Sequence, residues 1–143
     1  MGLDWLAFAL LSAVAASFVA IFAKIGLTGV DTNLATAIRA VIMALFLSGV
    51  IIAQGKLDKL PSLLSNNKAL LFIVLSGLAG AVSWLFYFIA LQKGNVAQVA
   101  AIDRLSVVFA TVFAFVILSE KISPGTAIGV ALITIGAIII AMG

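Results

Sequence analysis

The stretch VAQVAAIDRLSVVFATVFAFVIL, from Val96 to Leu118, carries two adjacent charges inside an otherwise apolar run. Its length suits a membrane-spanning helix, which needs about 20 mostly apolar residues. A charged side chain near the membrane centre costs about 2.5 to 3.5 kcal/mol, so Asp103 and Arg104 together cost about 5 to 7 kcal/mol. The apolar residues return only about 0.3 to 0.6 kcal/mol each. Ionisable residues kept at such depth generally line a bundle interior or a polar pathway.

The composition is that of an integral membrane protein. Of the 143 residues, 65% are hydrophobic and 9% are charged, whereas about a quarter of the residues in a soluble domain are charged. The net charge of +3 is too small and dispersed to predict a nucleic-acid partner. The chain has no Cys and no His, which removes thiol chemistry and the commonest metal ligand. We therefore expect no metal, no cofactor and no catalytic residues, and an enzyme is disfavoured.

Five stretches are long and apolar enough to cross a membrane, and we assign them to one domain covering residues 1–143. They lie at about residues 5–25, 34–53, 69–91, 96–118 and 126–142. The sequence therefore predicts an all-α integral membrane fold of five transmembrane helices, with the termini on opposite sides. Short connections make consecutive helices antiparallel neighbours. Asp31 and Pro124 suit helix starts.

The distribution of lysines favours the N-terminal side of the membrane as the cytoplasmic side. Loops on that side carry four lysines, and the opposite side carries two. The four are Lys56, Lys59, Lys68 and Lys121, and the two are Lys24 and Lys93. Because this excess is small, insertion in both orientations stays an open alternative.

Polar and aromatic side chains from several helices should occupy the same half of the membrane. The second and fourth helices begin on the same side, so Arg39 and Asp103 both lie about 9 to 11 Å below that face. The third helix ends there, which brings Trp84 and Tyr87 to a comparable depth. These two rings are either interfacial belt residues or walls of a cavity. Lys24 closes the first helix on this side, and we expect it to snorkel toward the headgroups.

Asp103 has two candidate partners, Arg39 and Arg104, and pairing would lower the cost of burying both charges. Asp103 and Arg104 differ by about 100° around the helix axis, so their side chains cannot share one direction. Ser106 lies on the same stripe as Asp103. Two interpretations stay open: an ion pair that only fixes helix register, or a group of residues that contacts a ligand.

Small residues mark faces at which helices can approach one another closely. The third helix has Gly77 and Gly80, and the fifth has Gly129 and Gly136. Small residues at such spacings permit close contact in lipid, where packing drives helix association. Packing within one chain and dimerisation would produce the same pattern, so the sequence leaves both alternatives open.

Several segments resemble the EamA domain of the drug/metabolite transporter superfamily, over nearly the full length of the chain. They are TAIRA at 36–40, LSGLAGAVSWLFYF at 75–88, AAIDRLSVV at 100–108, LSEKIS at 118–123 and the glycine-bearing helix at 126–142. The AAIDRLSVV segment is the most specific, since it is similar to the Pro-Ile-Asp-Lys-Leu-Ser pattern of short, single-domain members. Ala101 replaces the Pro of that pattern and Arg104 replaces the Lys. Without the Pro, we expect the fourth helix to be straighter.

The resemblance implies one five-helix unit of a transporter for small metabolites or drugs, located in the inner membrane of a prokaryotic cell. Larger relatives carry two such units in inverted orientation, and secondary transporters bind substrate between inverted repeats. An antiparallel homodimer with dual topology would supply the second unit. The alternative is a non-transporting subunit, or a half-transporter that needs a second five-helix partner.

The resemblance also suggests roles for the polar residues and partners for the chain. Asp103 would couple a proton or a cation to transport, whereas Arg39 and Arg104 would neutralise it or bind an anionic substrate group. Trp84 and Tyr87 would form walls of the cavity. The expected partners are the lipid bilayer, a small-molecule substrate and a second copy of the chain.

Overall fold

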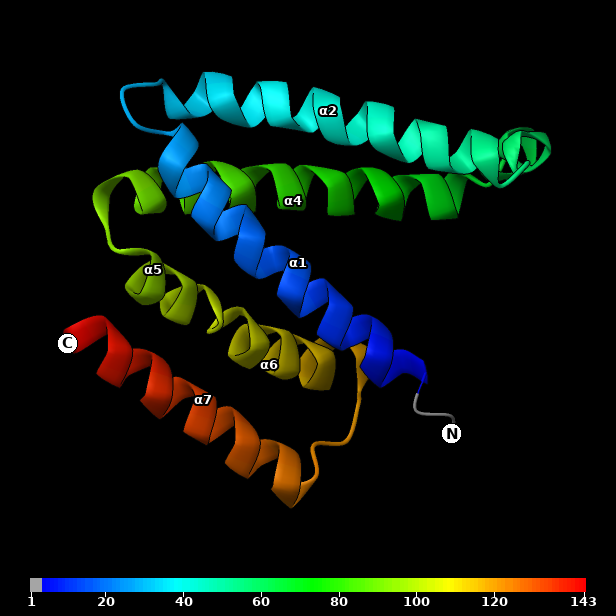
Figure 1. Cartoon of the computed structure of the whole chain (residues 1–143). Coiled ribbons are helices and arrows are strands. Elements are labelled where there is room, and N and C mark those ends of the chain that lie inside the picture. Colours follow the sequence, from blue (N-terminus) through cyan, green and yellow to red (C-terminus); the bar gives the residue numbers. More distant parts are fainter. Residues whose placement is uncertain (1–3) are drawn as a thin grey trace. The chain divides into compact units, whose positions relative to one another are not determined.

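The computed structural model describes residues 4–143, and the regular elements in this range are all helical (Figure 1). In chain order they are α1 (Asp4–Gly26), α2 (Thr32–Ala53), the 3₁₀ helix η1 (Leu57–Lys59), α3 (Leu60–Leu64), α4 (Asn67–Lys93), α5 (Val96–Asp103), α6 (Ser106–Leu118) and α7 (Pro124–Met142). Five stretches of this range are long and apolar enough to cross a membrane, namely α1, α2, α4, α5 together with α6, and α7. This result confirms the predicted all-α fold.

The helices expose most of their large apolar side chains. Phe8 on α1 and Ile117 on α6, for example, are each 72% exposed, whereas Leu91 is fully buried. A helix that is apolar on all sides needs an apolar environment around it. The exposed faces therefore suit contact with lipid.

Two long helices begin next to residues that the sequence predicted as helix starts, and each has a side-chain cap. The backbone N–H of Leu34 donates to the Asp31 carboxylate at 2.8 Å, before α2. The N–H of Thr126 donates to Ser123 Oγ at 3.1 Å, and Pro124 is the first residue of α7. These bonds matter because the first N–H groups of a helix have no partner within the helix.

The described residues fall into two compact units. One of them, residues 27–89, contains α2, η1, α3 and most of α4. Here α2 and α4 run antiparallel (Figure 1), as the short connections predicted. The connection between them, which we expected to be a loop, contains the short helices η1 and α3.

The other unit contains α1 and residues 90–143. Within it α5 packs most closely against α7, and Gln98 Nε2 of α5 donates to the Ala141 carbonyl of α7 at 3.3 Å. Ala20 of α1 and Ala137 of α7 are buried, at 4% and 5% exposure. Small side chains at these points let neighbouring helices come close.

Lys24 connects α1 to the end of α4 in this unit. Its Nζ donates to the Leu91 carbonyl at 2.6 Å and to the Gly94 carbonyl at 2.8 Å. The last carbonyls of a helix lack partners within the helix, and a cation at that end also interacts favourably with the helix dipole. The ammonium group of Lys24 therefore caps a neighbouring helix, a role that the sequence did not predict, and the expectation that Lys24 snorkels toward the headgroups stays a prediction.

We predict that Lys24→Met lowers the free energy of unfolding by about 1 to 3 kcal/mol, since it removes two hydrogen bonds from a charged donor. Unfolding with SDS in mixed micelles measures this loss. Lys93→Met is the matched control, because Lys93 is exposed near the same end of α4 and should change stability by less than about 0.5 kcal/mol. Equal effects of the two substitutions would contradict the capping role.

Candidate functional site

Arg39 of α2 stacks on aromatic rings of α4. Its guanidinium carbon lies 3.5 Å from the centroid of the Trp84 ring and 5.3 Å from that of Phe88. A cation within about 6 Å of an aromatic centroid is attracted by the ring electrons, and the attraction is strongest for Trp and in desolvated settings. The stacking therefore offsets part of the cost of holding Arg39 within an apolar span.

Three aromatic residues of α4 form the platform for this cation. Trp84 meets Tyr87 and Phe88 edge to face, with centroid separations of 5.6 and 5.7 Å, and the Tyr87 and Phe88 centroids are 6.5 Å apart. Positions separated by three and four residues share one helix face, which explains the cluster. Such aromatic pairs favour edge-to-face geometry.

Phe88 is the member of this cluster that the sequence reasoning missed. Its side chain is 3% exposed, whereas Trp84 and Tyr87 are half-buried. The available signal was its position four residues after Trp84, on the same face of the helix. Phe88 is thus the buried base of the cluster, and the two partly exposed rings are placed to contact other groups.

Arg39 stacks on Trp84 through the flat face of its guanidinium group, so the edge of that group does not contact the ring. The N–H donors of a guanidinium point outward in its plane, and they match the oxygens of a carboxylate or phosphate. An Arg held by its face against an aromatic ring can therefore present these donors to an anionic group. This geometry fits the substrate-binding role that the sequence suggested for Arg39, Trp84 and Tyr87.

The second group of predicted residues lies where the fourth span is interrupted. Arg104 and Leu105 separate α5 from α6. The N–H of Leu105 donates to the Ile102 carbonyl at 2.9 Å, and the N–H of Val107 donates to the Arg104 carbonyl at 3.0 Å. Both bonds reach back three residues, so the chain tightens here from α-helical into 3₁₀ geometry.

This interruption divides the predicted fourth helix, residues 96–118, into α5 and α6, although the whole stretch is one candidate membrane span. The prediction that this helix is straighter, because Ala101 replaces a Pro, stays a prediction. A Pro interrupts a helix by removing a hydrogen-bond donor, whereas here the N–H groups of Arg104, Leu105 and Val107 each donate to the carbonyl three residues earlier. The break therefore forms without a Pro, and a short 3₁₀ stretch within a helix often marks a hinge.

Polar side chains cluster along the chain at this break. Asp103 is the last residue of α5, Arg104 follows it, and Ser106 is the first residue of α6. All three are exposed. Backbone that departs from an α-helix at membrane depth is tolerated where it is buried in protein or lines a water-filled cavity. The site thus combines an acid, a base and a hydroxyl group with an interrupted backbone.

The predicted residues therefore form two groups, one in each compact unit. Arg39, Trp84 and Tyr87 belong to residues 27–89, whereas Asp103 belongs to the other unit. The expected pairing of Asp103 with Arg39 stays a prediction. Among the described residues, no cluster of three or more His, Cys, Asp or Glu side chains is arranged to hold a metal ion.

The four predicted packing glycines have free space around them. These glycines are Gly77, Gly80, Gly129 and Gly136. Leaving out the backbone of the same helix and the adjacent residues, a Cβ atom added at any of them would have no atom within 4 Å. Within its own compact unit, each of these glycines therefore has no other described helix in close contact.

The sequence model described as the EamA-like transporter family matches residues 3–142. This chain belongs to the EamA-like transporter family. The match covers both compact units, and the residues of both candidate groups lie inside it. Family membership and the five apolar helices make it an integral membrane protein.

A relative from Sinorhizobium sp supports the same assignment. It is named "Uncharacterized transporter in cobO 3'region", and it is 39% identical over 142 residues, which cover 99% of each chain. No solved structure matches this EamA-like chain.

We predict that Arg39 and Trp84 are energetically coupled in the EamA-like chain. A double-mutant cycle with Arg39→Met and Trp84→Leu should give a coupling of about 1 to 2 kcal/mol in the free energy of unfolding, because each single change removes the same cation–π contact. Phe86 is 68% exposed on the same helix, so a cycle of Arg39→Met with Phe86→Leu serves as the control. Additive effects in the first cycle would refute the contact.

Proposed function

We propose that this protein is a secondary active transporter that moves a small metabolite or drug-like molecule across the inner membrane of a prokaryotic cell. Membership in the EamA-like transporter family and the transporter name of the Sinorhizobium relative support this function over catalysis. The observation that carries the proposal is the break of the fourth span beside Asp103 and Arg104. Transporters commonly build substrate and ion sites from such discontinuous helices.

In the proposed mechanism, Asp103 is the group that couples a proton or a cation to transport. A carboxylate within the membrane can bind either one, and its charge is then neutralised during movement. Arg104 adjoins Asp103 at the break and balances its charge in the unloaded state, or binds an anionic group of the substrate. Ser106 adds a hydroxyl that can donate or accept a hydrogen bond.

The stacked pair of Arg39 and Trp84 forms a second part of the proposed substrate site. The edge of the Arg39 guanidinium suits an anionic substrate group, and the partly exposed rings of Trp84 and Tyr87 offer apolar contact to the rest of the substrate. Ligand sites usually combine a mostly apolar lining with a few placed polar groups. This combination fits a small organic molecule better than an inorganic ion.

The proposed functional unit is an antiparallel homodimer. One five-helix chain supplies half of the inverted pair that secondary transporters use. The free space at Gly129 and Gly136 supports a contact with a second copy, since it leaves room for a close helix approach. The alternative is a half-transporter or subunit that needs a different five-helix partner.

We predict that Asp103→Asn lowers transport at least about tenfold, since an amide cannot take up the coupling charge. Arg104→Gln should reduce transport as well. Proteoliposomes on a solid-supported membrane can be screened with a panel of small metabolites, and the compound giving the largest current then serves as the substrate. Asp58→Asn is the matched control, because Asp58 is an exposed acid of the α2–α4 connection. Native-like transport in both Asp103→Asn and Arg104→Gln would refute this site assignment.

We also predict that the chain inserts in both orientations. The native sequence has no Cys, so Ser62→Cys in α3 and Asn95→Cys in the turn between α4 and α5 each give one thiol. Each should react with a membrane-impermeant maleimide in both intact spheroplasts and inside-out vesicles. In a single orientation, each thiol would react from one side only, and the two thiols would react from opposite sides. That result would remove the simplest route to an antiparallel homodimer.

A further inference from the structure

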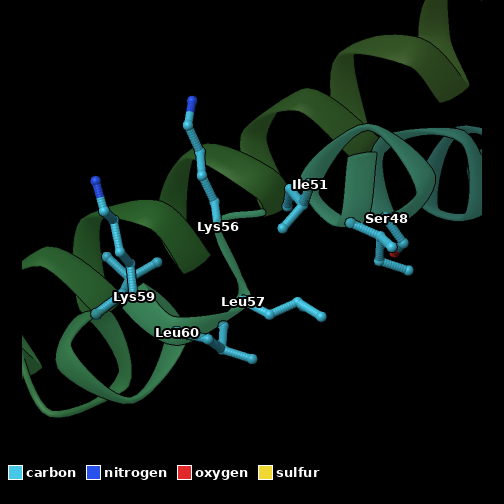
Figure 2. Close-up of a pocket in the computed structure, with 8 residues that line it drawn as sticks. Ser48, Ile51, Lys56, Leu57, Lys59 and Leu60 are labelled. Atoms are coloured by element: carbon cyan, nitrogen blue, oxygen red, sulfur yellow. The ribbon is translucent and has the colours of Figure 1, made fainter. Parts of the chain in front are cut away.

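A pocket lies at the end of α2, within residues 27–89 and apart from the Arg39 cluster (Figure 2). Its volume is about 480 Å³. Ile51 and Ile52 of α2 line it together with three leucines of the η1–α3 segment, which are Leu57, Leu60 and Leu63. The lining is therefore almost entirely apolar, apart from Ser48 and two lysines.

The two lysines, Lys56 and Lys59, lie on the same side of this pocket. The N–H of Lys59 donates to the Lys56 carbonyl at 3.2 Å, which makes one turn of 3₁₀ geometry. With three residues per turn, side chains three positions apart lie above one another. Figure 2 shows both lysines extended in one direction, while Leu57 and Leu60 point away from that direction.

The pocket reaches from the apolar span to the charged residues beyond it. Its α2 residues belong to the last two turns of a helix that ends at Ala53, and the lysines follow that end. In a membrane the span's end lies near the boundary between hydrocarbon and headgroups. Ile51 and Ile52 therefore lie near the depth of acyl chains, and Lys56 and Lys59, which follow the end of the span, lie nearer the headgroup phosphates.

We propose that this pocket binds one anionic phospholipid. The apolar side chains of α2, η1 and α3 contact an acyl chain, and the ammonium groups of Lys56 and Lys59 hold the headgroup phosphate. The charge pattern and the lining favour a lipid over free phosphate, which gains nothing from the isoleucines and leucines. Asp58 lies between the lysines in sequence but does not line the pocket. The site does not depend on the transport function.

Native mass spectrometry of the full chain tests this site. The protein is released from detergent in the presence of equal amounts of phosphatidylglycerol and phosphatidylcholine with identical acyl chains. We expect preferential retention of phosphatidylglycerol by the native chain. One lysine near an anionic lipid headgroup contributes a factor of about five, so Lys56→Gln with Lys59→Gln should weaken phosphatidylglycerol binding about 25-fold.

Two control variants separate the pocket from general charge and from misfolding. Lys68→Gln with Lys121→Gln removes the same charge outside the pocket and should change binding less than about twofold. Lys56→Arg with Lys59→Arg keeps the charge and should retain the lipid. Equal binding of the two lipids by the native chain would overturn the proposal, as would native-like binding by the double Gln variant. Displacement of phosphatidylglycerol by inorganic phosphate at millimolar concentration would also overturn it, in favour of a free-phosphate site.

Discussion

The structure depends on one constraint: hydrocarbon offers no partner for a polar group, so each such group in a span must find one within the protein. Several hydroxyl groups within the spans bond back to their own helix, as Thr36 Oγ1 does to the Thr32 carbonyl at 2.7 Å. Lys24 bonds to the carbonyls at the end of α4, and Arg39 stacks on Trp84. Thr36, Lys24 and Arg39 thus each have a partner within the protein.

The same constraint separates structural polar groups from functional ones. Lys24 has both of its contacts with backbone carbonyls, so its charge is used in holding helices together. Asp103, Arg104 and Ser106 are exposed beside an interruption of the backbone. The face of the Arg39 guanidinium is held against the Trp84 ring, and its edge points away from that ring. We propose that these two groups contact the substrate.

Much of this arrangement was predictable from residue patterns. Lengths of apolar sequence predicted the five spans, and Asp31 and Pro124 predicted helix starts. Counting residues from the helix ends placed Arg39 and Trp84 at a similar membrane depth. It could not predict their stacking, because stacking depends on how α2 is rotated against α4. The break at Arg104 was not predictable from residue types, because a shift to 3₁₀ bonding needs no Pro or Gly. The partner of Lys24 was also missed, since backbone carbonyls carry no sequence signal.

Single-cysteine accessibility tests most directly the proposal that the break beside Asp103 is part of a water-accessible substrate site. Ser106→Cys and Phe113→Cys lie two turns apart on one face of α6, in a chain that has no native Cys. A charged, water-soluble thiol reagent applied to proteoliposomes should modify Ser106→Cys at least about tenfold faster than Phe113→Cys, because only water-exposed thiols ionise and react readily. Equally slow modification of both thiols would contradict the account.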